Sequence, residues 1–513
     1  MLALARAFFP DYVFHWDEVQ LTLALERFDL RSHQPHPPGY YLFVALGRLL
    51  RPLVAAPENA LRSLAAAGCA AFVPLVAAAL PAAARPLARA LHVVAAAAFV
   101  ACSPLALLHA VSASTYTVEA ACWLGILLAL ARRPAGGRLG VLGAGIGLAG
   151  GIRPTLIVWG LVAAALVWLG DHDWPGRRAA PRAFAALALG AAAWAVPLLL
   201  EAGGPRAYLA AAGPTLVGNI WEKSVFHEGL AAAMTRLARL TADLALALGP
   251  LLAASGVALV ARLRPRWRAR LAPLDLLLVG AAIPFLFYVL LIYDSDGYVL
   301  AVALPLAAHG LCAVATLLAG LRLRDQLVGA GAVLALALVA WPSGAAFAPA
   351  RGHRVLAAHD ADVAARVGAI RRGFKPAETV LVTSHEYWAW GLRHVMYYLP
   401  EYTTVQLIPD RFYAAAGPET PYLTAREHRI AVAGPDGLSL GSLGASVRDI
   451  VYMIPHDVNT FITASCGPYL RRLPTRPGES LPVLRLGPQL DVRVERAQLH
   501  CARPGTRPAP STG

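Results

Sequence analysis

The residues with the clearest chemical potential lie in the first forty positions. Asp17 and Glu18 form an acidic pair, and the turn His36-Pro37-Pro38-Gly39 follows them. A carboxylate within hydrogen-bond reach of a hydroxyl can take up its proton while the oxygen attacks, which is general-base catalysis. The same pair would also stabilise the first turn of a helix predicted at 19–28, so a capping role is the structural alternative.

Histidines accompany the acidic pair in the sequence. His15 lies two positions before Asp17, and His36 opens the proline turn. Imidazole can bind a substrate or move a proton near neutral pH. We interpret both histidines as candidate substrate-binding residues, with a purely local hydrogen bond as the alternative for each.

The composition is that of a membrane protein. The 513 residues are 58% hydrophobic and 15% charged, which is far too apolar for a soluble chain of this length. Apolar runs of helical length recur up to position 342, and such runs suit ~30 Å of hydrocarbon. The net charge of +14 comes almost wholly from arginines. Because these are dispersed between apolar runs, we expect no nucleic-acid partner.

Ten apolar runs predict transmembrane helices. They lie at 59–80, 88–108, 113–131, 139–152, 154–170, 183–200, 241–261, 274–292, 298–319 and 326–342. The fourth run is short, since fourteen helical residues rise only about 21 Å. Glycine and proline at its end predict a broken helix that lines a cavity rather than facing lipid.

Arginines alternate between the connections of these runs. They follow the first, third, fifth, seventh and ninth runs, whereas the connections 109–112 and 293–297 contain neither Lys nor Arg. Basic loops stay cytoplasmic. The pattern therefore places the acidic pair, the loop 201–240 and everything after position 342 outside the cytoplasm.

The run 38–50 would invert this pattern if it were counted as a span. We interpret it as an amphipathic helix at the outer membrane interface. Its aromatic residues Tyr40, Tyr41 and Phe43 would then lie at headgroup depth.

From position 343 the charge rises and short β-rich runs begin. They lie at 379–383, 403–408, 429–433, 449–454 and 491–495, with a helical stretch at 387–399. This pattern predicts an α/β domain with a disordered tail at 503–513. The predicted organisation is a partial first helix and outer acidic loop with interfacial helices at 1–58, a transmembrane bundle at 59–342, and an extracytoplasmic α/β domain at 343–513.

Two of the six cysteines, Cys466 and Cys501, fall in this outer domain. Disulfides persist outside the cytoplasm, and two cysteines allow one pairing, so we predict a disulfide between them. The other four lie in or beside apolar runs and suit small core positions.

Arg153 follows the glycine-rich stretch 143–151 at the end of the fourth run. An arginine at that depth is expensive unless it has a partner. Its guanidinium could pair with Glu119, or it could bind a phosphate with its planar fork of donors. The sequence leaves both alternatives open.

The order of these features resembles the GT-C superfamily of membrane glycosyltransferases. It is most similar to the branch of protein O-mannosyltransferases and lipid A aminoarabinose transferases. The matching features are the outward Asp17-Glu18 pair, the Pro37-Pro38 motif, the segment 114–119, and Arg153 after its glycine-rich helix. The resemblance covers 8–320. It implies an α-helical polytopic GT-C-like bundle. A full transmembrane helix precedes the acidic loop in that branch, whereas only fourteen residues precede it here, too few to span.

The resemblance also implies a reaction. A polyprenyl-phosphate-linked sugar would lie in the bilayer, and an acceptor hydroxyl of a protein, envelope glycan or lipid would attack C1 with inversion. Asp17 would be the base and Glu18 would orient acceptor or sugar, while Arg153 would stabilise the leaving phosphate. This branch does not generally require a metal, so we expect no cofactor, although the acids and a histidine could bind a divalent ion.

Further candidate substrate-binding residues lie in outer segments. They are Tyr116, Glu119, Lys223, His227, Asp294 and Asp296. For Asp294 and Asp296 a turn-forming role is an equal alternative.

A transporter or lipid flippase is the alternative function, because broken helices and intramembrane charge fit it as well. The sequence shows no inverted repeat, and the large outer domain is unusual for a carrier. We therefore expect a multi-pass enzyme of the inner or plasma membrane, with mannosyl transfer as the specific activity.

Overall fold

The computed structural model describes residues 9–30, 34–170, 179–213, 220–347, 353–384, 392–407, 430–432, 438–439, 447–453, 462–486, 490–495 and 498–502. The chain divides into two units, each treated by itself below. The helical unit comprises Met1–Phe9 and Pro37–Val355, and the α/β unit comprises Pro10–His36 and Leu356–Gly513. The division after His36 lies inside the region 1–58, which the sequence analysis treated as one, so the acidic segment groups with the C-terminal domain.

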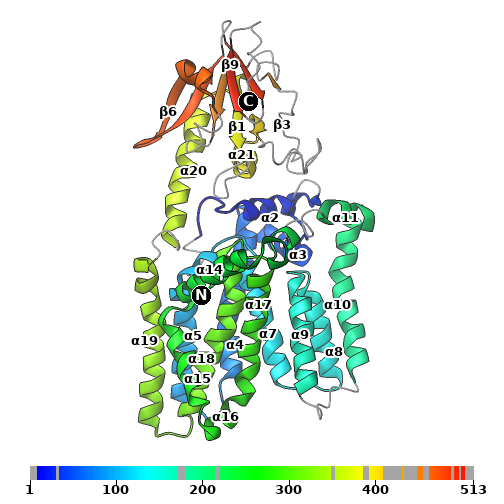
Figure 1. Cartoon of the computed structure of the whole chain (residues 1–513), viewed down its shortest axis with the longest axis vertical. Helices are drawn as coiled ribbons and strands as arrows, with labels where there is room; N and C mark the ends of the chain where they lie inside the picture. Colours follow the sequence, from blue (N-terminus) through cyan, green and yellow to red (C-terminus); the bar gives the residue numbers. More distant parts are fainter. Residues whose placement is uncertain are drawn as a thin grey trace. The chain divides into compact units, whose positions relative to one another are not determined.

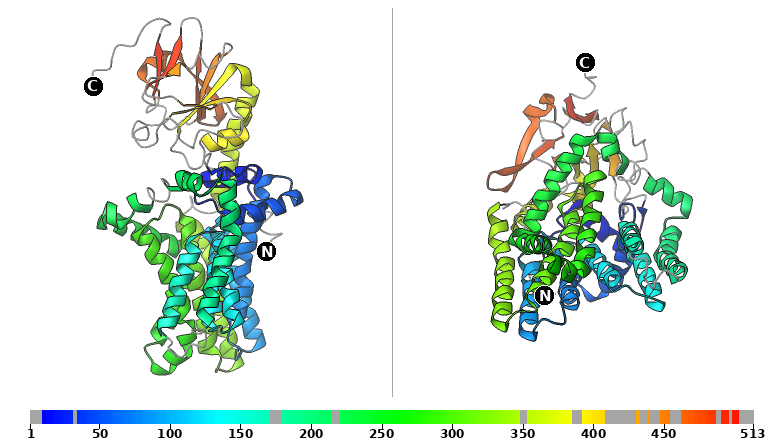
Figure 2. Two further views of the ribbon diagram at one scale, coloured as in Figure 1. Left: turned by 90° about the vertical axis from the view of Figure 1, so that its right-hand side faces the viewer. Right: turned by 60° about the horizontal axis from the view of Figure 1, so that its bottom comes forward.

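The helical unit has a helix at each of the ten apolar runs, and these helices run side by side (Figures 1 and 2). They are α4 (Pro57–Ala79), α5 (Pro86–Cys102) with α6 (Pro104–Ala110), α7 (Tyr116–Ala131), α8 (Gly137–Ala149), α9 (Thr155–Gly170), α10 (Ala180–Glu201), α14 (Leu230–Leu248) with α15 (Leu252–Ala261), α17 (Asp275–Leu290), α18 (Leu300–Leu318) and α19 (Leu323–Phe347). Among the described residues, five helices are long and apolar enough to cross a membrane, or six with one bent pair. The helices α7, α8 and α9 are shorter.

Two predicted runs are broken rather than continuous. The run 88–108 bends by 73° between α5 and α6. Pro104 begins α6 without an N–H to donate, and Ser103 caps that helix by accepting from the Ala106 amide. The run 241–261 breaks at a short 3₁₀ turn, Gly249–Leu251, and its first helix already begins at Leu230.

Close backbone packing joins the short helix α8 to α10. A Cβ atom on Gly143 would lie 2.2 Å from the Ala183 carbonyl oxygen, and one on Gly190 would lie 2.3 Å from the Ala144 carbonyl oxygen. Small residues allow helices to approach this closely in membranes. The Trp194 indole also donates to the Gly147 carbonyl at 2.8 Å.

The predicted interfacial run forms helix α3 (Tyr41–Leu50). It is tied to the glycine turn after α8 because the Leu42 amide donates to the Gly151 carbonyl at 2.9 Å. The prediction for the aromatic residues needs correction. Tyr40 and Phe43 are 8% and 0% exposed, so both are packed inside the protein rather than facing lipid. Tyr41 is partly buried and donates to Glu201.

The α/β unit contains a six-stranded sheet with the order β3-β2-β1-β5-β7-β6. Its strands are β1 (Thr379–Ser384), β2 (Thr403–Leu407), β3 (Ile430–Val432), β5 (Asp449–Tyr452), β6 (Leu470–Arg476) and β7 (Glu479–Arg485). The pairs β1–β2, β1–β5 and β2–β3 are parallel, whereas β7 pairs antiparallel with β5 and β6. Val380 lies opposite Thr403 and Ile450. The helices α20 (His353–Gly373) and α21 (Leu392–Tyr398) supply core residues such as Ile370 and Val395.

A second sheet has the order β4-β8-β9, with β4 (Leu438–Ser439), β8 (Asp491–Glu495) and β9 (Gln498–Ala502). All five β-rich runs of the sequence are strands, while β4, β6, β7 and β9 were missed. The helix predicted at 387–399 is present as α21; its start, and the tail 503–513, lie outside the described residues.

The predicted disulfide is confirmed. Cys466 and Cys501 are bonded with their Cα atoms 4.9 Å apart, within the usual range for a bridge. The bond joins the 3₁₀ turn Ala464–Tyr469 to β9. It therefore attaches the second sheet to the preceding chain.

Candidate active site

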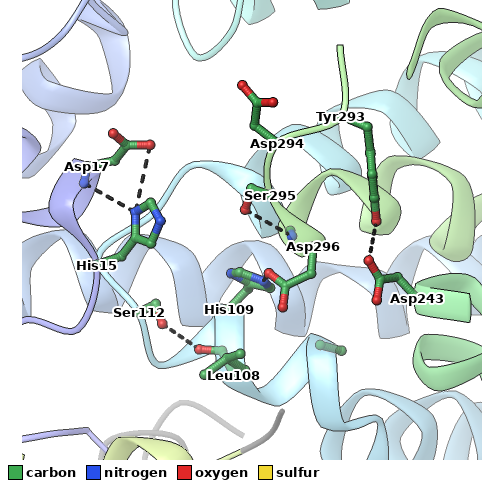
Figure 3. Close-up of polar contacts among 12 residues, drawn as sticks. His15, Asp17, Leu108, His109, Ser112, Asp243, Tyr293, Asp294, Ser295 and Asp296 are labelled. Atoms are coloured by element: carbon green, nitrogen blue, oxygen red, sulfur yellow. Dashed lines mark hydrogen bonds and ion pairs between the residues drawn. The ribbon is translucent and has the colours of Figure 1, made fainter. Parts of the chain in front are cut away.

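Asp17 lies in the first turn of helix α2 (Trp16–Glu26) in the α/β unit. His15 is the N-cap, and its Nδ1 accepts a hydrogen bond from the Asp17 amide at 3.2 Å (Figure 3). The Asp17 carboxylate lies 3.8 Å from His15 Nδ1 and 3.6 Å from His36 Nδ1. The structure thus brings three predicted site residues together, and the helix-start position expected from the capping alternative is also observed.

The two acids differ in accessibility. The Asp17 side chain is 29% exposed, whereas Glu18 is 2% exposed. Asp17 is therefore the acid of the pair that an acceptor could reach in this structure. Among the residues that the structure describes, no group of three His, Cys, Asp or Glu side chains is placed to hold a metal ion.

Arg153 lies in the turn between α8 and α9 in the helical unit. Its Nη1 donates to Glu119 Oε2 at 2.9 Å, and the Thr155 hydroxyl donates to Glu119 Oε1 at 3.0 Å. Both charged residues are buried. The ion pair that the sequence allowed is therefore present, and it joins α7 to the turn that precedes α9.

Three tyrosine rings surround the Arg153 guanidinium. Its Cζ lies 4.6 Å from the ring centre of Tyr298, 5.0 Å from that of Tyr116 and 5.6 Å from that of Tyr40. Such contacts attract a cation to the ring face. Within the described part of the chain, Nη1 has a hydrogen-bond partner, while Nε and Nη2 have none. The guanidinium is thus held in place with donors left for a further oxygen ligand.

A histidine that the sequence analysis missed lies beside this cluster. His109 Nε2 lies 3.1 Å from Asp296 Oδ1 (Figure 3), and its ring packs edge-on against Tyr116. Tyr116 in turn contacts Tyr298. Asp296 and Tyr116, both predicted candidates, therefore join the surroundings of Arg153. The only sequence signal for His109 was its position at the end of an apolar run.

Two of the remaining candidates, Lys223 and Asp294, lie in a second polar group of the helical unit. Lys223 Nζ lies 2.7 Å from Asp294 Oδ2, and Arg239 donates to the Asp294 carbonyl at 3.3 Å. Nearby on the same segment, Arg236 pairs with Glu228 at 2.9 Å. His227 is not part of this group, since its Nδ1 contacts the Glu222 carbonyl within its own segment.

The helical unit also contains an apolar cavity of about 230 Å³ between α7, α8, α9 and α10. Leu, Ile, Ala, Gly, Phe and Trp form its whole lining, including Gly143, Ile146, Trp168 and Phe184. This lining suits a hydrocarbon ligand, since apolar cavities stay dry and bind apolar molecules.

These features define a multi-pass membrane protein with a GT-C-like fold and a C-terminal α/β domain. A crystal structure of ArnT from Cupriavidus metallidurans bound to undecaprenyl phosphate is similar to this chain, with a TM-score of 0.58 and 12% identity, over 94% of this chain and 96% of that one. The apo ArnT crystal structure matches with a TM-score of 0.51 and 13% identity over the same shares. No protein-family model and no curated protein sequence matches the chain. At such identities the likeness shows the fold.

Proposed function

We propose that this protein is an integral membrane glycosyltransferase that uses a polyprenyl-phosphate-linked sugar. Two observations support this function: the shared fold and an apolar cavity. The fold is shared with ArnT over nearly the full length of both chains, and one of those structures contains undecaprenyl phosphate. The apolar cavity between α7 and α10 suits a hydrocarbon chain.

The observation that carries the proposal is the geometry of Arg153. Guanidinium groups bind phosphate through paired N–H donors, and Arg153 keeps Nε and Nη2 without partners among the described residues. Glu119 and the tyrosine rings fix the group, so little side-chain entropy remains to be lost when a phosphate binds. In our proposal Arg153 stabilises the charge that develops on the departing lipid phosphate.

Asp17 is the proposed base. The acceptor oxygen forms a bond to C1 of the sugar, the bond from C1 to the phosphate oxygen breaks, and the configuration inverts. The hydroxyl proton moves to the Asp17 carboxylate, and the bonding electrons leave with the phosphate. The partial exposure of Asp17 supports this role. Glu18 is buried. Its proposed role is to orient the acceptor or the sugar.

The reaction is proposed to take place on the outer face of an inner or plasma membrane. The alternating arginines of the loops favour that orientation, and the Cys466–Cys501 disulfide is typical of an oxidising compartment. As the finer proposal, the donor carries mannose, and the acceptor is a hydroxyl of a protein, an envelope glycan or a lipid. No metal cofactor is part of the proposal.

A donor panel tests this function. The purified protein in lipid nanodiscs is incubated with polyprenyl phosphates that carry mannose, aminoarabinose or glucose, and released polyprenyl phosphate is quantified with and without a mixture of acceptors. We expect release from one donor that depends on acceptor and is lost in Arg153→Ala. Transbilayer movement of a lipid-linked sugar in vesicles, without any release, would instead establish the transporter alternative.

A further inference from the structure

The backbone just before the acidic pair is held by side chains of the C-terminal domain. The Asp360 carboxylate accepts two hydrogen bonds, from the Asp11 amide at 2.7 Å and from the Tyr12 amide at 3.1 Å. The next amide, that of Val13, donates to the Tyr398 hydroxyl at 2.6 Å. Hydrogen bonds to an ionised carboxylate are among the stronger ones in proteins. Three consecutive amides are thus fixed by residues of α20 and α21.

Side-chain packing fixes the same segment on both sides of Asp17. Val13, Val19 and Leu23 form a buried cluster with Met396 of α21. Phe14 packs edge-on against His359 of α20, with ring centres 5.1 Å apart. These contacts lie before and after Asp17 in the sequence, so the first turn of α2 is held at both of its ends.

Trp16 adds an aromatic contact at the position next to Asp17. The guanidinium of Arg393, which is completely buried, lies 5.8 Å from the Trp16 ring centre. A cation over an aromatic face is stabilising, more so when it is desolvated. Hydrogen bonds, apolar packing and a cation–π contact therefore hold the chain around Asp17 against α20 and α21.

We infer that the C-terminal domain positions the acidic segment, and that Asp360 and Tyr398 are positioning residues for Asp17. The inference rests on the proposed function, because it assigns Asp17 the proton transfer. A general base must lie within hydrogen-bond reach of the proton it takes, and a misplacement of about 1 Å can cost 10²-fold in rate. Asp17 follows the last anchored amide by four positions, so movement of that anchor moves the carboxylate.

Two variants remove the anchor while keeping side-chain size. Asp360→Asn replaces one acceptor oxygen by a donor, and Tyr398→Phe removes the hydroxyl that accepts from Val13. Matched controls lie in the same domain. Asp362→Asn removes a carboxylate that pairs with Arg366 on the same helix, and Tyr402→Phe removes a hydroxyl that donates to the Phe374 carbonyl.

Hydrogen exchange tests these anchoring hydrogen bonds independently of sugar transfer. In the full-length protein, the amides of Asp11, Tyr12 and Val13 should exchange at least about tenfold faster in Asp360→Asn or Tyr398→Phe than in the wild type, and unchanged in the controls. Unaltered exchange at these amides would overturn the inference even if activity fell.

Kinetics then test positioning. We expect kcat to fall by roughly 10–100-fold in the two anchor variants, with the KM for the donor changed less than about threefold, while the controls keep normal kcat. A normal kcat together with faster exchange would also overturn the inference, because the anchor would then hold the segment without placing Asp17.

A double variant separates positioning from general stability. If Asp360 acts through Asp17, adding Asp360→Asn to Asp17→Asn should lower the residual rate no further. An additional loss of the same size as in the single variant would indicate a structural role and contradict the inference. If Asp17→Asn is itself fully active, the proposed base is wrong, whereas the exchange result still reports on the anchor.

Discussion

Arg153 and Glu119 form a buried ion pair in which Nη1 lies 2.9 Å from Oε2. The pair connects α7 with the turn between α8 and α9. The Thr155 hydroxyl donates a hydrogen bond to the other carboxylate oxygen of Glu119. Removing one member of such a pair leaves an uncompensated charge, which typically costs about 3–5 kcal/mol. Loss of activity in a single Arg153 variant would therefore combine a structural effect with any effect on the donor.

Removing both charges separates these effects. The double variant Arg153→Met with Glu119→Leu should melt close to the wild type, because an apolar replacement of a buried pair is often neutral, yet it should transfer no sugar. Arg153→Lys should recover only part of the donor use, because lysine lacks the planar fork. Melting temperature and donor-dependent rates are the measurements. Normal transfer by the double variant would show that the pair is purely structural.

Asp17→Asn should fold and insert normally but lose transfer. Removal of a positioned proton acceptor typically lowers the rate by about 10²–10⁴-fold. Asp29→Asn is the matched control, because Asp29 lies in the same segment and pairs with Arg27 at 3.7 Å. Near-normal turnover of purified Asp17→Asn, or an equal loss in the control, would argue against the assigned base.

The packing of α8 on α10 predicts a position-dependent effect of a single methyl group. Gly143→Ala places a Cβ 2.2 Å from the Ala183 carbonyl oxygen, whereas nothing lies within 4 Å of a Cβ on Gly145 of the same helix. We expect Gly143→Ala to destabilise the protein by about 1–3 kcal/mol, as overpacking does, and Gly145→Ala to have little effect. Thermal unfolding in detergent compares the two. Equal melting temperatures would contradict the observed helix contact.

The disulfide should contribute to the stability of the α/β unit. Cys466 and Cys501 are separated by 35 positions, for which the chain-entropy model gives roughly 3–4 kcal/mol. Cys466→Ser, or reduction, should lower the unfolding temperature of this unit while the helical unit is unaffected. Thiol titration of the unfolded protein without reductant provides the control, and four reactive thiols are expected if the bond is present. Titration of all six cysteines would show that the bond is absent.

His394 predicts a loss of stability in acid. Burial lowers the pKa of its imidazole to about 3, and His359 and His15 lower this pKa further. Hydrogen bonds that the imidazole donates to the backbone of Phe14 and Val13 partly offset the lowering. Between about pH 6.5 and 3, the unfolded chain binds a proton at this site and the folded chain does not. The free energy of unfolding of the α/β unit should therefore fall by about 1.4 kcal/mol per pH unit as the pH decreases through this range.

Denaturant unfolding from pH 7 to 4 measures this slope. Other groups also titrate in the range, so the comparison is with His394→Leu, in which the contribution of this imidazole is absent and the slope should be shallower. Parallel slopes in the two proteins would mean that His394 is not a buried neutral imidazole.

Much of the architecture could be predicted from the sequence because the relevant physics is local. A chain that crosses hydrocarbon must carry a continuous apolar run with its backbone hydrogen bonds made internally, and all ten runs are helices. The disulfide was predicted from the two cysteines that follow the last apolar run, in the C-terminal domain. The Arg153–Glu119 pair was foreseen as one of two alternatives, because a buried arginine needs a partner.

Other features have no local signature. Asp360 lies 349 positions from Asp11, and nothing in the type or spacing of either residue indicates that they meet. The burial of Tyr40 and Phe43 and the approach of His109 to Asp296 likewise depend on which helices pack together. Apolar patterning by itself determined which segments form the helical bundle, and it indicated five of the strands of the C-terminal domain. Only the tertiary structure decided that the acidic segment packs against the C-terminal domain. Contacts between segments so far apart arise from packing and complementary hydrogen bonds, which no single stretch of sequence encodes.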